Sequence, residues 1–377
     1  MIRISRLPSG CRFCYTVFLG EQGAKPAGFV PFFRRFCRKI APDRRREKEN
    51  PMDVTLFYTP LSGSLNERYK NFLCSAGLRD EGDADVVALM LDDDFQIAAC
   101  GARAGHTLKQ FAVSPDLEGG GACASVLSEL MNEASRSGVR RLFLCTKPQN
   151  LAMFASMGFY PLVQTRDAVL MEDRKGGFES FLASIPHREG NCGAIVLNGD
   201  PFTRGHLHLT EYAAARCDAL YLFSVSEEGS LFSPDERFEM LERGTAHLKN
   251  RILCRSDAYL VSRATFPAYF IRDERHADAV RSDLDVELFR SRIAPALHIT
   301  TRFVGEEPYS LTTRAYNERM KELLPERGIE LIEIPRLDGI SASRVRALIK
   351  EGRIEETKGL VPETTYDVII RYAQRHA

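Results

Sequence analysis

The pattern of apolar and polar positions divides the chain into two halves that fold differently. In the first half, from residue 53 to about residue 174, amphipathic segments of helix length alternate with short apolar runs. The runs typical of strands lie at 86–91, 96–101, 108–113 and 141–145, and the segments typical of helices lie at 66–77, 122–137 and 151–157. This alternation predicts one mixed α/β domain over residues 52–175.

The second half has a more regular pattern. Apolar runs at 193–197, 219–225, 251–253, 299–304 and 329–334 alternate with amphipathic segments at 206–216, 234–248, 286–296 and 312–324. Strands separated by helices indicate βαβ units, and therefore a parallel, doubly wound (Rossmann-like) sheet over residues 190–377. Stretches rich in Gly and Pro between residues 175 and 191 predict a linker, and ligands are expected at the carboxyl edge of the parallel strands.

The composition is that of a globular protein. Of the 377 residues, 44% are hydrophobic and 27% are charged, and the length suits two hydrophobic cores better than one. No stretch approaches the roughly 20 apolar residues that a transmembrane helix needs, and the N-terminus lacks a signal-peptide pattern. We therefore expect a cytoplasmic protein without a membrane partner. The ten cysteines predict reduced thiols, and Cys11 and Cys14 have no second ligand pair nearby, so we predict no metal site built by the protein.

The first 51 residues differ from the rest in charge. They contain 12 Lys and Arg against 4 Asp and Glu, although the whole chain has 51 of each kind. A basic segment of this kind can contact nucleic acid or a membrane surface. Because the first strand-like segment begins only after Met52, we favour a poorly ordered extension over residues 1–51, with no nucleic-acid partner.

A glycine-rich turn precedes the helix predicted at 122–137. Gly119, Gly120 and Gly121 follow a strand, and free backbone N–H groups at such a helix start can hold phosphate. Together with 150–159, this segment resembles the GNAT acyltransferase fold, and the resemblance implies an acetyl-CoA site. Asp116 stands where the family pattern has Gln or Arg, and Glu118 adds a second negative charge, which opposes binding of an anion. Acetyl-CoA binding and a turn without a ligand therefore both remain open.

A second strand, turn and helix sequence opens the C-terminal half. Residues 198–206 read Asn-Gly-Asp-Pro-Phe-Thr-Arg-Gly-His, and they lie between an apolar strand and a helix. The N–H groups and polar side chains at this helix start favour binding of a triphosphate. The segment resembles the (H/T)-x-G-H signature of the nucleotidyltransferase superfamily, with Thr203 first and His206 last. A local cap without a ligand is the alternative.

Near the C-terminus, residues 339–346 resemble the second phosphate-binding element of the same superfamily. Ser341, Ser343 and Arg346 match its I-S-S-T-x-x-R pattern, whereas Ala342 replaces a hydroxyl. Hydroxyls at a helix start with an arginine one turn further can bind an anion through charge-assisted hydrogen bonds. Arg237 opens another helix and is expected at the same edge, although a solvated position is equally consistent with the sequence.

Longer segments carry a closer resemblance, to the citrate lyase ligase family, over about residues 53–377. They are 193–206, 262–270, 284–295, 303–309 and 340–346. The resemblance implies His206, Thr203 and Arg346 as catalytic residues, and it implies that the nucleotide phosphates are bound by Asn198, Thr203, Gly205, His206, Arg237, Ser341, Ser343 and Arg346. Asp200 stands where Asn is expected in the family, and it could bind a metal or fix the turn.

The reaction that this resemblance implies consumes ATP, with Mg²⁺ on its phosphates, and acetate. Acetyl-AMP forms and pyrophosphate leaves, after which the thiol of the prosthetic group on the acyl carrier subunit of citrate lyase is acetylated and AMP leaves. Three alternatives stay open. They are a nucleotidyltransferase acting on a small phosphorylated substrate, a GNAT enzyme that acetylates an amine, and a docking module without catalysis.

Overall fold

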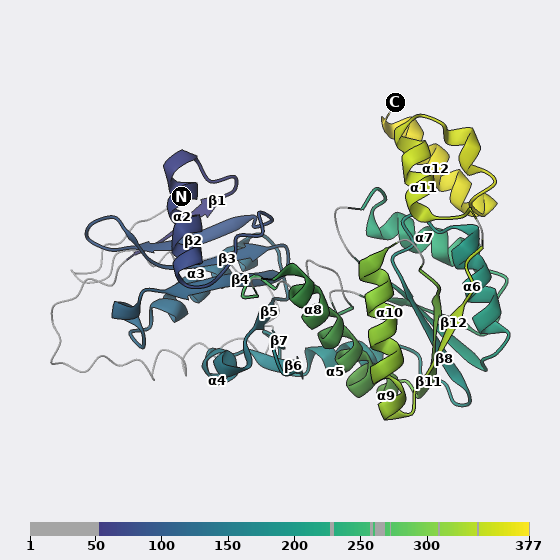
Figure 1. Cartoon of the computed structure of the whole chain (residues 1–377), viewed down its shortest axis with the longest axis horizontal. Helices are drawn as coiled ribbons and strands as arrows, with labels where there is room; N and C mark the ends of the chain where they lie inside the picture. The colour runs from purple at the N-terminus through teal and green to yellow at the C-terminus, as the bar shows by residue number, and fades with distance from the viewer. Residues whose placement is uncertain are drawn as a thin grey trace, which may run out of the picture. The chain divides into compact units, whose positions relative to one another are not determined.

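The computed structural model describes residues 53–226, 230–256, 259–260, 268–271, 273–307, 310–337 and 339–376. Within these ranges the chain forms two β-sheets with helices packed on them (Figure 1). The basic segment 1–51 and the Cys11–Cys14 pair lie outside the described residues. Among the residues that the structure describes, none of the helices combines the length and apolar character required for a transmembrane span.

The first sheet has seven strands in the order β1-β2-β3-β4-β5-β7-β6. Strands β4 and β5 pair in parallel, and the other neighbouring strands pair in antiparallel fashion. The strands are β1 (Val54–Tyr58), β2 (Val86–Leu91), β3 (Ile97–Ala104), β4 (Thr107–Val113), β5 (Phe143–Thr146), β6 (Tyr160–Gln164) and β7 (Val169–Glu172). The predicted mixed α/β fold of this half is confirmed.

Both faces of this sheet are covered by helices, because the apolar side chains of its strands point to both sides. On β2, Val86 and Ala88 pack in one cluster with Val126 and Leu130, whereas Val87 and Leu89 pack in a second cluster with Leu73. The helices of this half are α2 (Gly63–Ser75), α3 (Ala122–Arg136) and α4 (Leu151–Ser156). The continuous apolar run of β2 is therefore the signature of a strand that is buried on both faces.

The second sheet is fully parallel, with five strands in the order β10-β9-β8-β11-β12. The chain runs outward from β8 through β9 to β10 and then returns to the other side of β8, so the winding direction reverses between β8 and β11. The strands are β8 (Cys192–Leu197), β9 (Ala219–Ser224), β10 (Arg251–Arg255), β11 (Ile299–Gly305) and β12 (Glu330–Ile334). The predicted doubly wound sheet is confirmed.

Helices cover the second sheet on both faces. Residues of α8 and α10 share one hydrophobic cluster with Ala194 and Tyr221, and residues of α6, α7, α11 and α12 share another with Ile195 and Leu220. Helices α8 and α10 lie side by side (Figure 1). The helices are α5 (Gly177–Ser184), α6 (Arg204–Ala214), α7 (Pro234–Gly244), α8 (Glu274–Leu288), α9 (Ala294–Ala296), α10 (Leu311–Leu323), α11 (Ala342–Lys350) and α12 (Glu363–His376).

The start of α8 differs from the prediction. The sequence indicated a helix over 286–296, whereas the structure begins it at Glu274 and continues from Leu288 through a π-helical turn, Phe289–Ile293, into α9. The first part, up to Asp285, is rich in charged residues, and its apolar positions are few. Its buried face is narrow, with Ala277, Val280 and Leu284, so tertiary packing rather than a wide apolar stripe fixes this part of the helix.

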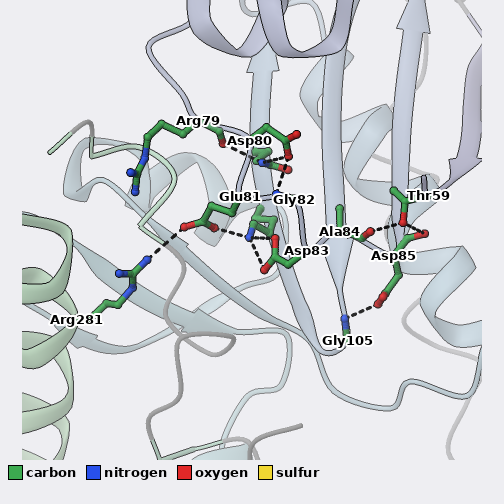
Figure 2. A network of polar contacts seen from close by, with 12 residues as sticks. Thr59, Arg79, Asp80, Glu81, Gly82, Asp83, Ala84, Asp85, Gly105 and Arg281 are labelled. Carbon is green, nitrogen blue, oxygen red and sulfur yellow. Dashed lines mark hydrogen bonds and ion pairs between the residues drawn. The ribbon is translucent and has the colours of Figure 1, made fainter. Parts of the chain in front are cut away.

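Polar contacts also join the first sheet to α8. Lys109 on β4 is 1% exposed and is held by Asp83, at 2.7 Å from Nζ to Oδ1, and by Glu81. Glu81 also pairs with Arg281 of α8, with its Oε1 3.3 Å from the guanidinium Nη2 (Figure 2). Side chains of both sheets share a single hydrophobic cluster, which contains Phe143 and Tyr221. The placement of the domain boundaries at residues 175 and 190 stays a prediction.

Candidate nucleotide-binding site

A cavity of about 640 Å³ opens at the carboxyl ends of β8, β11 and β12. It lies where the winding of the sheet reverses, which is where open parallel sheets bind their ligands. The loop after β8, the starts of α6 and α11, the end of β11 and one side of α10 all contribute to its wall. Of the residues predicted from the sequence, the structure brings these to the cavity: Asn198, Thr203, Gly205, His206, Ser341, Ser343 and Arg346.

Thr203 and His206 hold each other at the start of α6. The Thr203 hydroxyl accepts a hydrogen bond from the His206 backbone N–H at 3.4 Å, and the Thr203 backbone N–H donates to His206 Nδ1 at 3.0 Å. Because an N–H can only donate, Nδ1 must be the unprotonated nitrogen and Nε2 carries the proton. Burial, with a smaller contribution from Arg336, lowers the pKa of His206 to about 4. The site therefore contains a neutral imidazole with a single fixed N–H donor.

The second helix start in the cavity is that of α11. Ser341 caps it, with its hydroxyl accepting from the Arg344 backbone N–H at 3.1 Å, and the hydroxyl of Ser343 lies 3.1 Å from that of Ser341. The start of α6 approaches closely, since a Cβ on Gly205 would lie 3.8 Å from Ile340. Two helix starts thus face one cavity, and their dipoles favour an anion there.

Asp200 fixes the loop after β8, which leads into α6. It is 6% exposed, and its carboxylate accepts hydrogen bonds from the backbone N–H groups of Phe232, at 3.0 Å, and Leu231, at 3.2 Å. Arg346 donates to the Asp200 backbone carbonyl, and its Nη1 lies 3.6 Å from Asp200 Oδ2. Of the two roles considered for Asp200, the structure supports the fixing of the turn. It also places Arg346 at the edge of the cavity.

Arg237 lies behind the cavity wall. It is 1% exposed, and its Nη1 donates to the backbone carbonyl of Asn198 at 3.2 Å, to the side-chain oxygen of Asn198, and to the carbonyl of Val225 at 2.9 Å. Arg237 is not among the described residues that line the cavity. Its observed contacts hold Asn198 in place, and direct binding of phosphate by Arg237 stays a prediction.

Residues that the sequence did not single out complete the wall on the side of β11 and α10. They include Arg302, Tyr316, Asn317, Met320 and Arg336. The polar positions of α10 resemble those of a solvated helix face, so nothing in the sequence indicated that they belong to a site. Arg302 carried a usable signal, because a lone arginine within an apolar strand is buried and needs a partner. In the described part of the chain, no group of three or more His, Cys, Asp or Glu side chains could hold a metal ion.

A second cavity, of about 690 Å³, lies at the glycine-rich turn of the first sheet. Gly119, Gly121 and the first residues of α3 line it. Gly121 has φ of +86°, a conformation that favours glycine. Glu118 also lines the cavity. Asp116 is exposed and is not among the described residues that line the cavity. One of the two predicted opposing charges is therefore present at the cavity.

The two sheets and the first cavity define a class of protein: a GNAT-like domain followed by a nucleotidyltransferase-like domain with a cavity at the carboxyl edge of its parallel sheet. Residues 192–369 match the family model described as the citrate lyase ligase C-terminal domain. The chain is 41% identical over 320 residues to the [citrate [pro-3S]-lyase] ligase of Klebsiella pneumoniae, covering 82% of this chain and 93% of that protein. The ligase of Escherichia coli K12 is 36% identical over 292 residues, covering 74% and 83%. The chain belongs to the citrate lyase ligase family.

Solved structures with similar folds are more distant. Thermotoga maritima TmcAL bound with α-thio ATP aligns over 49% of this chain and 56% of its own, with 14% identity and a TM-score of 0.37. Escherichia coli ElaA aligns over 32% of this chain and 99% of its own, with 14% identity and a TM-score of 0.29.

Proposed function

We propose that this protein activates citrate lyase by acetylating it, in a reaction that converts ATP to AMP and pyrophosphate. The membership of the ligase family supports the reaction. The observation that carries its nucleotide-dependent part is the convergence of two helix starts, with Thr203, His206, Ser341, Ser343 and Arg346, on one cavity at the carboxyl edge of a parallel sheet.

The proposed chemistry has two steps. One oxygen of the acetate carboxylate attacks the α-phosphorus of ATP, the bond between that phosphorus and the bridging oxygen breaks, and pyrophosphate leaves with acetyl-AMP remaining. A thiolate then attacks the acetyl carbon, a thioester forms, and AMP leaves with the oxygen that linked it to the acetyl group. Each step needs positioning and stabilisation of charge rather than a covalent side chain.

The residues of the cavity are suited to stabilise the charge on the phosphates. His206 would donate from Nε2 to a phosphate oxygen, and its neutral state allows this hydrogen bond at every pH near neutrality. Arg346, anchored on Asp200, would supply a positive charge from the opposite helix start. The hydroxyls of Ser341 and Ser343 would complete the set of donors.

Mg²⁺ is expected on the nucleotide. The cavity contains the carboxylates of Glu306 and Glu307, of which Glu307 accepts from Arg336 at 3.0 Å. Mg²⁺ is usually held by substrate phosphates together with one or two carboxylates. The small number of carboxylates in the cavity is consistent with this mode of binding. The ion would neutralise charge on the leaving pyrophosphate.

The proposed acceptor is the thiol of the prosthetic group on the acyl carrier subunit of citrate lyase. A thiol on a flexible arm can reach the cavity from a separate protein, and the acetyl-AMP would be protected in the cavity until the thiol arrives. The GNAT-like cavity supports a second candidate function, transfer of acetyl from acetyl-CoA, because the start of α3 offers backbone N–H groups there. Glu118 in its wall opposes a pyrophosphate, so we favour the ATP-dependent reaction.

The test is to incubate the purified protein with deacetylated citrate lyase, ATP, Mg²⁺ and radiolabelled acetate. The expected result is label on the carrier subunit, released by hydroxylamine as a thioester is, with one AMP formed for each acetyl group transferred. Labelling that requires acetyl-CoA and not ATP would favour the GNAT reaction instead. A nucleotide covalently joined to a product would favour a plain nucleotidyltransferase, and binding without release of pyrophosphate would favour a docking module.

A further inference from the structure

The wall of the nucleotide cavity contains a buried arginine that the phosphate-binding elements do not explain. Arg302 lies on β11, on the side of the sheet covered by α8 and α10, and it is 2% exposed. Its Nη2 donates to the hydroxyl of Tyr316 at 3.1 Å, and its guanidinium carbon lies 4.2 Å from the centre of the Phe289 ring. Its Nε and Nη1 have no hydrogen-bond partner among the described residues.

This arginine also lacks a direct carboxylate partner. Within the described residues, no carboxylate oxygen lies in ion-pair distance of Arg302. The nearest acidic group in its network is Asp285, which is reached through the Tyr316 hydroxyl that donates to it. A buried cation with open donors is costly unless an anion pairs with it. The buried Asp285 carboxylate offsets part of this charge: burial raises the pKa of Asp285, and the positive charge of Arg302 acts to lower it. The unpartnered Nε and Nη1 favour a further anion, one that is not part of the protein.

The other two arginines of the cavity are already engaged. Arg336 donates to Glu307 at 3.0 Å and to the carbonyl of Ile340 at 3.3 Å. Arg346 is anchored on Asp200, at the helix starts that form the phosphate side of the cavity. Arg302 stands on the β11 and α10 side of the same cavity. Arg346 and Arg302 thus belong to two different walls of the cavity, and this arrangement suits two different anions.

We infer that Arg302 binds the carboxylate of the small acid substrate, which in the proposed reaction is acetate. This inference rests on the proposed function. One carboxylate oxygen is held by Arg302 at the inner wall, and the other oxygen is free to attack the α-phosphorus of the nucleotide bound along α6 and α11. Met320 lines the same wall one helical turn beyond Tyr316 and is fully buried, so it offers an apolar contact for the methyl group and limits the length of the acid.

The test compares Arg302→Gln with the wild-type protein in acetate-dependent ATP–pyrophosphate exchange, with acetate and ATP varied separately. Loss of a charged hydrogen bond to the substrate predicts an increase of about 10- to 100-fold in KM for acetate. KM for ATP should change by less than about twofold, because the substitution weakens binding of acetate and leaves the contacts to the nucleotide intact. Arg314→Gln is the matched control, because Arg314 is an exposed arginine of α10, and it should leave both values unchanged.

A structural role of Arg302 would give a different result. Addition of methylguanidinium to Arg302→Ala should restore part of the exchange if the missing cation binds acetate, whereas a merely destabilised protein would not respond. If Arg302→Gln does not fold, as judged by thermal unfolding, Arg302→Lys decides the question, because it keeps a buried cation and loses the guanidinium geometry. An unchanged KM for acetate in the folded variant, or an increase in KM for ATP, would overturn the inference. Absence of acetate-dependent exchange in the wild type would instead refute the proposed function.

Discussion

Replacement of Asp200 tests whether this carboxylate holds the loop after β8 or serves another purpose. In Asp200→Ala, the N–H groups of Leu231 and Phe232 lose their acceptor, and an unsatisfied buried N–H costs about 1–3 kcal/mol. The ion pair with Arg346 adds little, because the Arg346 side chain is 35% exposed and solvent screens the pair. We therefore expect Asp200→Ala to lower the free energy of unfolding by about 3 kcal/mol.

Asp200→Asn is the informative partner of this variant. Its amide oxygen can still accept one of the two N–H groups, whereas its NH₂ group faces the other, so we expect a loss of about 1–2 kcal/mol. Urea unfolding at pH 7, followed by far-UV circular dichroism, measures both values. A loss below about 0.5 kcal/mol for Asp200→Ala would refute the reasoning. Stabilisation of the nucleotide-free wild type by Mg²⁺ that disappears in Asp200→Asn would support the metal-binding role instead.

Three further predictions follow from the site and the core. His206→Ala and Arg346→Ala should each lower kcat of the ATP-dependent reaction by about 10²- to 10³-fold without loss of the fold, because each removes a donor that we propose for the phosphates. His208→Ala and Arg344→Ala are the exposed controls, and retained turnover in both site variants would overturn the assignment. The His206 ring resonances should stay constant from pH 8 to about pH 5 in NMR titration, since its pKa is lowered to about 4. As the pH falls, His206 is protonated in the unfolded chain before it is protonated in the folded protein. The contribution of His206 to stability is therefore complete above its ordinary pKa of 6.5 and declines as the pH falls towards 4. Titration of His206 near pH 6.5 would contradict the proposed tautomer. Gly193→Ala should lower the free energy of unfolding by about 1–3 kcal/mol, because its Cβ would lie 2.4 Å from Cys217 Sγ and 2.8 Å from Phe303, whereas Gly359→Ala, with no atom within 4 Å of the new Cβ, should not.

Much of the fold could be predicted because the apolar runs of the strands are short, strong and regularly spaced. Strands β2 to β5 of the first sheet and the strands of the second sheet were found in this way, and the helix start at Thr203 carried its own capping signal. Strand β7 of the first sheet was not predicted. The first turns of α8 were missed, since Ala277, Val280 and Leu284 form a narrow apolar face among charged residues. No helix was predicted at α12, whose buried residues Thr365, Val368 and Ile369 belong to a helix that packs against α7.

The candidate site could be predicted as far as its residues act through local structure. Thr203, His206, Ser341 and Ser343 belong to helix starts, and a short sequence specifies each start. Arg237 and Arg302 depend on the sheet for their position. The sequence alone could not show that Arg237 holds Asn198, or that Arg302 has two buried nitrogens without a partner among the described residues. Side chains of this kind become interpretable only when their burial and partners are known.

The central claim, formation of an acyl-adenylate in the cavity between β8 and β11, is tested most directly by ATP–pyrophosphate exchange. The purified protein is incubated with ATP, Mg²⁺ and labelled pyrophosphate, with and without acetate, and with His206→Ala as the negative control. Label should enter ATP only when acetate is present, and not with the variant. No exchange under any of these conditions, with deacetylated citrate lyase present as well as absent, would contradict the account.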